Sequence, residues 1–566
     1  MDDTLTRRGA GANSRRIVRV KSGCRTCRIR RVKCDEIRPS CSRCVQTGRT
    51  CDGYGIWNSG NQPGQNWLEN PSIPAFVHTS VAGLAGPDKQ LFEWFIREAI
   101  GKFNGVPEFP FWAKAMLQMC TTESVVLHTA LAVASAHRAE MINAGCLLIS
   151  GSRQSQKTAM AESETLQRYN KSIVLLRAEL SRQTTASIRV AIASCILFIC
   201  MEYIRRRFES GYRHLQCGLS LLKQISPRPS TTDPSSSDSG LSTDPLVDVL
   251  SRLDIQSKLL KNELHPGLCS QIFGSNEGIP SSFSSLREAR HHLNKLLATA
   301  HNLELECQKY GPTYNFTNPF ELLCGQKCLR NDLVSWTQSF NSLKVNNGAL
   351  LSQEKLAHDV LPIYHTLAYV ITEIALQPGD ECVFDKYTKQ FKFIVESSKE
   401  ILNTYLPTIL AEMLSGHCTA RFSFIADWGL IPPLYFVSLK CRDPRIRRKA
   451  IDLLANSLHR EGIWDGPTAA VIASEVVRLE EVNLYKDHFQ QLHATEGSAC
   501  AKVITDLLSP TTLPENCRIS NIEVCLPDGP TDELSFMGKA KRSDGSFEGF
   551  TRYYDGKSWS WKSKHD

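Results

Sequence analysis

The stretch that decides the fold at the start of this chain is CRTCRIRRVKCDEIRPSCSRCVQTGRTC, residues 24–51. Its cysteines follow the spacing C-x2-C-x6-C-x6-C-x2-C-x6-C, so the last three repeat the first three. Paired C-x2-C spacings are typical of zinc sites. The pattern predicts a small metal-bound fold made of two related halves, with these candidate ligands: Cys24, Cys27, Cys34, Cys41, Cys44 and Cys51.

Six thiolates at this spacing indicate two metal ions rather than one. Two tetrahedral zinc ions have more ligand positions than six separate thiolates can fill, so two of the cysteines must bridge both ions. Soft thiolate ligands favour zinc. Few apolar residues lie between Cys24 and Cys51, so metal binding should supply most of the folding free energy of this segment. We expect a zinc cofactor of two ions per chain.

Positive charge is concentrated in the same part of the chain. Residues 1–57 hold 14 Lys or Arg against 5 Asp or Glu, whereas the remaining residues hold 52 against 53. A basic segment beside a cysteine cluster is typical of a nucleic-acid-binding unit. The basic residues are also asymmetric between the two halves, because RIRRVK lies in the first and VQTGRT in the second. A short helix over Arg28–Lys33 could enter the major groove, where Arg and Lys donate to guanine.

The segment CRTCRIRRVKCDEIRPSCSRCVQTGRTC resembles the fungal binuclear zinc cluster family. All the cysteine spacings agree, Pro39 stands in the loop between the halves, and the basic run lies between the second and third cysteines. The resemblance implies that Cys24 and Cys41 are the bridging thiolates. It also implies that Arg30 and Arg31 contact the bases of a CGG-type triplet.

Other basic residues around the cluster are candidates for contacts to DNA phosphates, which would make binding salt-dependent. Simple solvation is an equal alternative for any single one of them. The candidate phosphate contacts are Lys21, Arg25, Arg28, Lys33, Arg43 and Arg49.

The start of the chain, MDDTLTRRGAGANSRR, has no apolar stretch of the kind that a signal peptide requires. The apolar run Val190–Cys200 is too short to span a bilayer and is followed by charged residues, so we predict a buried core helix. We therefore expect a reducing compartment, the nucleus, and no membrane contact. The other cysteines among the 21 are then free, buried thiols, including the pairs Cys195 with Cys200 and Cys324 with Cys328.

The 566 residues are too many for one compact core. We predict a basic N-terminal tail over 1–20, a zinc cluster over 21–53, a linker over 54–86, a helical domain over 87–510 and a C-terminal tail over 511–566. A Ser/Pro/Asp-rich insertion over 226–245 is expected to be disordered. The tail has the turn pairs and β-branched and aromatic residues typical of short strands or extended chain. The fold class is thus mainly α.

Two helices are well marked in the predicted helical domain. Ile188, Ile192, Ile196 and Cys200 recur at helical spacing and predict a helix deep in a bundle. Asp443 can cap a second helix that starts at Pro444, with its apolar stripe at Ile446, Ala450, Leu453 and Leu454. On that helix, Arg445, Arg447 and Arg448 are interpreted as a solvated face.

Passages such as FWAKAMLQMC, LFICMEYI and PPLYFVSLKCRDPRIRRKAIDLL resemble the fungal-specific regulatory domain that follows this zinc cluster in many proteins. The resemblance implies an all-helical domain that controls the output of the DNA-binding head in response to a metabolite or partner. No apolar heptad follows the cysteines, so a coiled-coil dimer is not supported, and monomer or homodimer stays open.

The function predicted from these features is zinc-dependent, sequence-specific DNA binding that regulates RNA polymerase II transcription of a metabolic or biosynthetic gene set. The expected partners are double-stranded DNA, the transcription machinery or co-regulators, and a small-molecule effector. No P-loop, Rossmann fingerprint, nucleophile elbow or H-E-x-x-H helix occurs in the sequence, so we predict no enzyme activity. The alternative is a scaffold whose zinc head binds protein or RNA.

Overall fold

The computed structural model describes residues 27, 30, 32–35, 41–47, 84, 86–103, 111–146, 152–225, 244–261, 278–309, 319–343, 352–414, 423–427, 429–457, 459–494, 513–529, 532–541, 545–556 and 558–563. The chain divides into two compact units, Met1–Pro71 and Ser72–Asp566. This division falls inside the predicted linker. Most of that linker and most of the predicted insertion lie outside the described residues.

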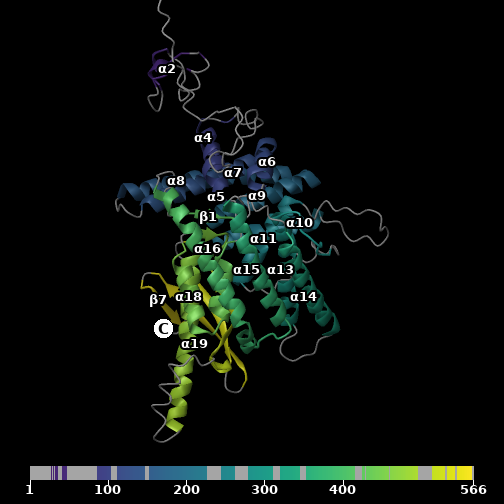
Figure 1. Ribbon diagram of the computed structural model, residues 1–566. Coiled ribbons are helices and arrows are strands. Elements are labelled where there is room, and N and C mark those ends of the chain that lie inside the picture. Colours follow the sequence, from purple (N-terminus) through teal and green to yellow (C-terminus); the bar gives the residue numbers. More distant parts are fainter. Residues whose placement is uncertain are drawn as a thin grey trace, which may run out of the picture. The chain divides into compact units, whose positions relative to one another are not determined.

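Helices dominate the described residues, so the predicted mainly α fold is confirmed (Figure 1). The α-helices are α2 (Ser42–Gln46), α4 (Gly86–Trp94), α5 (Ile100–Phe103), α6 (Leu117–Thr122), α7 (Ser124–Cys146), α8 (Ser152–Leu180), α9 (Thr185–Ile204), α10 (Phe208–Ile225), α11 (Pro245–Lys261), α13 (Leu286–Lys309), α14 (Pro319–Asn341), α15 (Ser352–Ile374), α16 (Thr388–Leu414), α17 (Ile431–Lys440), α18 (Pro444–Ala455) and α19 (Gly466–Ala494). Two π-helices, η2 (Phe95–Ala99) and η3 (Phe111–Met116), and two 3-10 helices, η4 (Glu381–Tyr387) and η5 (Glu515–Cys517), complete the helical elements.

Helix α9 is the central helix of the first half of the large unit. Thr184 caps it by accepting a hydrogen bond from the Ser187 backbone, and every residue from Val190 to Ile204 is buried. It packs against α7, α8, α10 and α11. By length and composition Thr185–Ile204 could cross a membrane, but 89% of its apolar window lies inside the fold. The prediction of a deep core helix is confirmed.

Helices α11, α13, α14 and α15 form a second layer beside this core (Figure 1). Trp336 of α14 shows how they are joined. Its ring is buried, its Nε1 donates to the Ala289 carbonyl of α13 at 2.7 Å, and it stacks on His365 of α15 at 4.9 Å between ring centroids. One aromatic side chain thus fixes three helices to each other.

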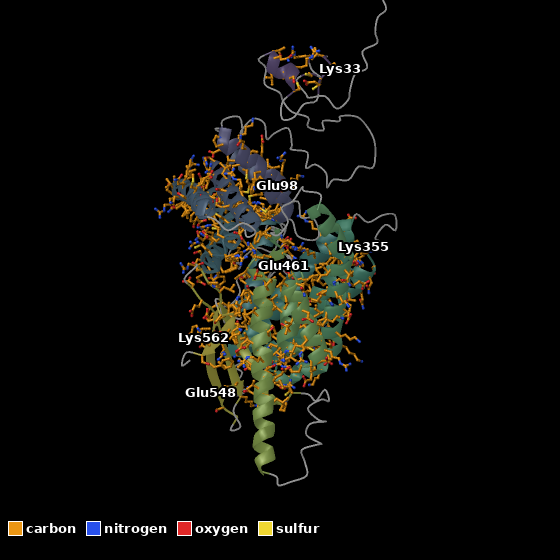
Figure 2. The ribbon with its side chains drawn as sticks, turned by 90° about the vertical axis from the view of Figure 1, so that its left-hand side faces the viewer. Lys33, Glu98, Lys355, Glu461, Glu548 and Lys562 are labelled. Carbon is orange, nitrogen blue, oxygen red and sulfur yellow. The ribbon has the colours of Figure 1, made fainter. Side chains whose placement is uncertain are left out.

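A small sheet interrupts the region that we expected to be all-helical. Strand β1 (Ser423–Ile425) pairs in parallel with β2 (His459–Glu461), which pairs antiparallel with β3 (Trp464–Asp465). Glu461 is buried among the helices (Figure 2), and its carboxylate accepts hydrogen bonds from the backbone of Leu430 and Ile431 at the start of α17. A Cβ at position 429 would meet that carboxylate at 2.0 Å, so Gly429 is required for this close approach.

The C-terminal residues form an antiparallel sheet of the strands β4 (Ile519–Cys525), β5 (Leu534–Lys541), β6 (Phe547–Asp555) and β7 (Ser560–Ser563), paired in that order. The predicted strands are therefore confirmed, but they are not an appended tail. Ile519 and Phe536 are buried in the same hydrophobic core as the helices, and β4 packs against α11. The sheet is an integral part of the large unit.

Helix α18 begins as predicted, because Asp443 accepts hydrogen bonds from the backbone of Arg445 and Ile446 at 2.9 and 3.1 Å. The interpretation of its arginines as a solvated face is wrong for Arg447, which is buried and ion-paired with Glu480 at 2.5 Å. Arg445 and Arg448 are exposed.

Two further expectations need correction. Cys195 and Cys200 are buried free thiols as predicted, but Cys324 and Cys328 are exposed on α14, because that face of the helix has no protein layer over it among the described residues. The predicted disordered insertion, 226–245, is too long at its end. Asp244 is buried and ion-paired with Arg189, and Pro245 begins α11.

Candidate metal centre and nucleic-acid interface

The structure describes part of the predicted site. Four of the six candidate zinc ligands are described: Cys27, Cys34, Cys41 and Cys44. Of the predicted DNA contacts, Arg30, Lys33 and Arg43 are described. The remaining predicted residues lie outside the described residues: Cys24, Cys51, Arg31, Lys21, Arg25, Arg28 and Arg49.

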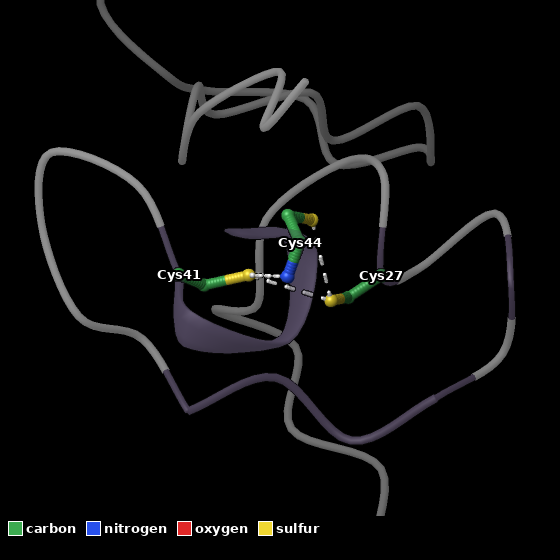
Figure 3. A group of neighbouring side chains, drawn as sticks. All are labelled: Cys27, Cys41 and Cys44. Carbon is green, nitrogen blue, oxygen red and sulfur yellow. Dashed lines mark hydrogen bonds between the residues drawn. The ribbon is translucent and has the colours of Figure 1, made fainter. Parts of the chain in front are cut away.

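Three thiols converge although they come from both halves of the cysteine repeat (Figure 3). Cys27 Sγ lies 3.6 Å from Cys41 Sγ and 3.9 Å from Cys44 Sγ, and all three side chains are fully buried. Tetrahedral zinc with Zn–S bonds of about 2.3 Å separates its sulfur ligands by about 3.8 Å. The donor set and its spacing therefore fit zinc.

Cys41 belongs to a second group of donors as well. Its Sγ, the Cys34 Sγ and a carboxylate oxygen of Asp35 all lie within 4.8 Å of one another. Cys41 is thus the thiol shared by the two groups, as a bridging ligand would be. Among the residues that the structure describes, no other set of three or more His, Cys, Asp or Glu donors gathers in this way.

The Asp35 carboxylate is already engaged by the backbone. Its Oδ2 accepts a hydrogen bond from the Ser42 amide at 2.9 Å, at the start of α2. Hydrogen bonding with Ser42, first from its side chain and also from its backbone, lowers the pKa of Asp35 below its ordinary value, so the group is a carboxylate at neutral pH. Asp35 therefore positions the second half of the cluster against the first.

Helix α2 presents the sulfur of Cys41 and the sulfur of Cys44 to the same point. Cys41 is its N-cap, and the Cys44 amide donates to Cys41 Sγ at 3.3 Å. A donated N–H favours the charged form of an acceptor, which is the thiolate that binds metal. The C-x2-C spacing thus places two metal-binding sulfur atoms on one helical turn. The backbone amide of Cys44 partly compensates the negative charge of the Cys41 thiolate.

None of the three described basic side chains of this region is buried. Arg30 Nη1 donates to Thr47 Oγ1 at 3.1 Å, and Thr47 Oγ1 in turn donates to the Arg43 carbonyl at 2.8 Å. Lys33, labelled in Figure 2, and Arg43 are exposed. A guanidinium has five N–H donors, so Arg30 keeps donors for another acceptor after it binds Thr47.

Sequence reasoning missed the roles of Thr47 and Asp35. Neither belongs to the cysteine pattern, and both act by hydrogen bonds between the two halves of the repeat. The only available signal was their position, Asp35 next to Cys34 and Thr47 after the turn that holds Cys44. That signal is too weak to distinguish them from other polar loop residues.

Two family models match the chain. The fungal Zn(2)-Cys(6) binuclear cluster domain matches residues 22–56, and the fungal specific transcription factor domain matches residues 90–308. The first of these domains binds two zinc ions and is a DNA-binding domain of transcription factors.

Curated transcription regulators are similar to the chain. The aspercryptin biosynthesis cluster-specific transcription regulator atnN of Emericella nidulans is 22% identical over 559 residues, which cover 82% of this chain and 88% of that protein. The transcription regulator lscL of Purpureocillium lilacinum is 27% identical over 36% of this chain and 50% of that protein.

A third relative matches only the N-terminal part. The pestheic acid cluster transcriptional regulator 3 of Pestalotiopsis fici is 47% identical over 64 residues, or 11% of this chain and 10% of that protein. No solved structure matches the chain. The thiol cluster, the two matching domains and the named relatives agree: the chain has a fungal Zn(2)-Cys(6) binuclear cluster domain, followed in sequence by a fungal specific transcription factor domain, and is a DNA-binding transcription factor.

Proposed function

We propose that this regulator recognises a CGG-type triplet in the major groove of duplex DNA, with Arg30 and Arg31 as the base-contacting side chains. The observation that carries the proposal is the convergence of Cys27, Cys41 and Cys44 at zinc spacing directly beside Arg30. Arg donates to guanine O6 and N7 in the major groove. The bond from Arg30 to Thr47 orients that arginine before DNA is bound.

The proposed ligands of the two zinc ions are the six cysteines of the repeat, with Cys24 and Cys41 as bridges. The position of Cys41 between two donor groups supports its bridging role. Bound zinc would supply the cross-links that a segment without an apolar core lacks. The fold of the head then depends on the thiolates, and the presentation of the arginines depends on the fold.

Two ions and six thiolates carry net negative charge, so the surrounding cations must offset it before they attract phosphate. Lys33 and Arg43 are exposed and are proposed phosphate contacts, together with Lys21, Arg25, Arg28 and Arg49. Contacts of this kind hold the protein in register on DNA without specifying sequence. We expect them to make affinity fall steeply with salt.

We propose that the protein acts in the nucleus on the genes of a biosynthetic cluster, as the names of its relatives say of those proteins. The proposed domain limits are 21–53 for the DNA-binding head and 87–510 for the helical part of the regulatory domain, to which the C-terminal sheet is added. Co-regulators, a homodimer and a small-molecule effector stay predictions. The proposal assigns no catalytic role to the helical unit.

A binding experiment on the zinc-loaded full chain tests the proposal. Fluorescence anisotropy would compare a duplex with a CGG site, the same duplex with the triplet scrambled, and a single-stranded RNA. We expect the CGG duplex to bind about 1000-fold more tightly than the scrambled one at moderate salt. Equal affinity for all three, or preference for RNA, would favour the scaffold alternative.

Two variants separate base contact from phosphate contact. Arg31→Ala should keep two zinc ions and lose about 1–3 kcal/mol of preference for the CGG duplex over the scrambled one. Arg43→Ala is the matched control, because loss of a phosphate contact should weaken both duplexes equally and reduce the salt slope by about one. An Arg31→Ala protein with unchanged sequence preference would refute the assignment of the base contact.

A further inference from the structure

A cavity of about 100 Å³ lies in the large unit where the helices meet the C-terminal sheet. Its walls come from α11, α13, the end of α15, η4, α17 and β4. Gly379, Asp380 and Asn521 line it and are exposed, so the cavity opens to solvent on that side. Asn521 has a positive φ of 49° in an irregular part of β4, where the register with β5 shifts.

Two polar side chains that line the cavity have no protein hydrogen-bond partner. His301 of α13 is buried, and neither of its ring nitrogens makes a hydrogen bond, although the Glu304 carboxylate lies 3.4 Å from Nδ1. The hydroxyl of Tyr435 of α17 is buried and unpartnered as well. Buried polar groups are nearly always hydrogen-bonded, so two orphans at one cavity point to a ligand or to bound water.

The rest of the wall combines an apolar surface with polar and charged side chains. Ile371, Ile374, Val383 and Leu439 are buried and supply an apolar surface. The charged groups at the cavity are engaged with protein partners, for example in the pair of Lys258 with Asp254 and the pair of Lys440 with Glu381, each at 2.6 Å.

These ion pairs favour a neutral ligand, because a charged ligand would have to compete with a partner that the lysine or carboxylate already has. A neutral ligand would cover the apolar wall and satisfy the orphan groups with one oxygen. An engineered protein cavity of about 150 Å³ binds benzene, so the ligand expected in this cavity is about as large as one small ring.

We propose that this cavity is a binding site for a small neutral organic molecule with an apolar ring or chain and a hydroxyl or carbonyl oxygen, which hydrogen-bonds His301 and Tyr435. The inference adds an effector site to the proposed regulator. The effect of the ligand on transcription rests on the proposed function, whereas ligand binding itself can be tested without DNA.

The position of the cavity explains how a ligand could affect the rest of the unit. Glu381 lines it and is bound to Arg442, which is bound to Glu480, and Glu480 accepts the backbone amide of Ile519 at the start of β4. Arg518 also donates to the Glu381 carbonyl at 2.7 Å. A ligand in the cavity would therefore contact the joint that holds the sheet to the helices.

Ligand-observed NMR titration of the zinc-loaded full chain tests the site with four probes: phenol, benzene, benzoate and benzylamine. We expect phenol to bind most tightly, because it alone joins a neutral ring to a hydroxyl group. Tyr435→Phe and His301→Leu should each weaken phenol about tenfold and leave benzene unchanged. The matched control is Tyr364→Phe, whose hydroxyl donates to the Gly429 carbonyl away from the cavity and whose loss should leave phenol binding unchanged.

Several outcomes would overturn the proposal. It fails if no probe binds, which would make the orphan groups a site for water only, or if an ionised probe binds more tightly than phenol. It also fails if Tyr435→Phe, the variant least able to disturb folding, binds phenol as the unmodified protein does. A protein that binds phenol in this way but shows no preference for CGG duplexes would keep the cavity site and refute only the DNA proposal.

Discussion

Glu480 of α19 is a buried acid with three protein partners. Its carboxylate pairs with Arg442 at 2.9 Å and with Arg447 at 2.5 Å, and it accepts the Ile519 amide at 2.9 Å. Burial alone would raise the pKa of Glu480, but the two arginines and the amide outweigh it and hold that pKa below its ordinary value. One side chain thus joins the connection between α17 and α18, α18 itself, α19 and the C-terminal sheet.

Glu480→Gln should destabilise the large unit by about 3–5 kcal/mol, because buried Arg447 loses its charge partner and buried Arg442 keeps only Glu381. Urea unfolding followed by circular dichroism measures the change. Glu481→Gln is the matched control next in sequence. Glu481 pairs with Arg448 at the surface, where both side chains are 41% exposed or more, so its loss should cost about 0.5 kcal/mol or less.

The same variant should change the pH dependence of stability. A carboxyl group with a lowered pKa in the folded state stabilises the fold above its unfolded pKa of about 4.3, and that stability is lost as pH falls through the folded value. The unfolding free energy of Glu480→Gln should therefore fall less than that of the unmodified protein between neutral and acidic pH. Parallel pH profiles, or equal losses in Glu480→Gln and Glu481→Gln, would contradict this role.

Thr47 carries a second prediction at this scale, because it is the described partner of Arg30. Thr47→Val removes the acceptor and should weaken binding to the CGG duplex about fivefold while zinc content stays at two ions. Fluorescence anisotropy and metal analysis measure the two quantities. Thr47→Ser keeps the hydroxyl and should bind like the unmodified protein, so equal weakening by both substitutions would exclude the hydrogen bond as the cause.

Residues of the metal site could be predicted from the sequence, whereas those of the buried ion pairs could not. The six cysteines lie within residues 24–51, so their spacing alone indicates shared ligands. Arg447 looked like part of a solvated face because its partner Glu480 lies on another helix. No local pattern distinguishes an arginine that pairs across helices from one that meets water.

At the scale of elements, a buried arginine connects the start of the C-terminal sheet to the helical part of the unit. Arg518 donates to the Leu513 carbonyl, to the Glu381 carbonyl and to the Asp385 carboxylate, at 2.7–3.0 Å. Its side chain is 1% exposed. These bonds connect β4 to η4, which also lines the cavity described above.

Arg518→Met should loosen this connection and cost about 2–3 kcal/mol, since three sets of hydrogen bonds are lost from a buried position. Hydrogen exchange should show lower protection in β4 and β5, with little change in α9. Lys541→Met is the control in the same sheet, because Lys541 pairs with Glu515 at a half-exposed site. Unchanged protection of β4 in Arg518→Met would mean that the other contacts of the sheet, such as the bond from the Ile519 amide to Glu480, hold it without Arg518.

Elements with a long periodic pattern were predictable, and short ones were not. Helix α9 and helix α18 follow apolar spacing and, in α18, a cap that the structure confirms. Strands β1, β2 and β3 have two or three residues each, and β1 pairs with β2 across a long stretch of intervening sequence. Their stability comes from tertiary contacts such as those of Glu461, which no local window contains.

On the scale of the whole molecule, the two compact units draw their stability from different sources. The unit Met1–Pro71 has a core of buried cysteines, whereas Ser72–Asp566 has an extensive hydrophobic core. Metal binding and folding are coupled in small sites of the first kind. In the sequence, the six-cysteine repeat and the excess of basic residues both end before the segments with helical periodicity begin.

Removal of zinc with a chelator should therefore abolish DNA binding without unfolding the large unit. We expect the main thermal transition in differential scanning calorimetry to shift by less than about 2 °C, while anisotropy on the CGG duplex falls to the level of free DNA. Zinc added back should restore binding. A large loss of helical signal on chelation would show that metal supports the large unit as well.

Native mass spectrometry of the full chain bound to a CGG duplex tests the central claim most directly, because one spectrum counts both metal and DNA. We expect a complex that carries two zinc ions per protein chain, and little complex with a duplex in which the triplet is scrambled. A DNA complex that contains one zinc ion or none, or that forms equally on both duplexes, would contradict the account.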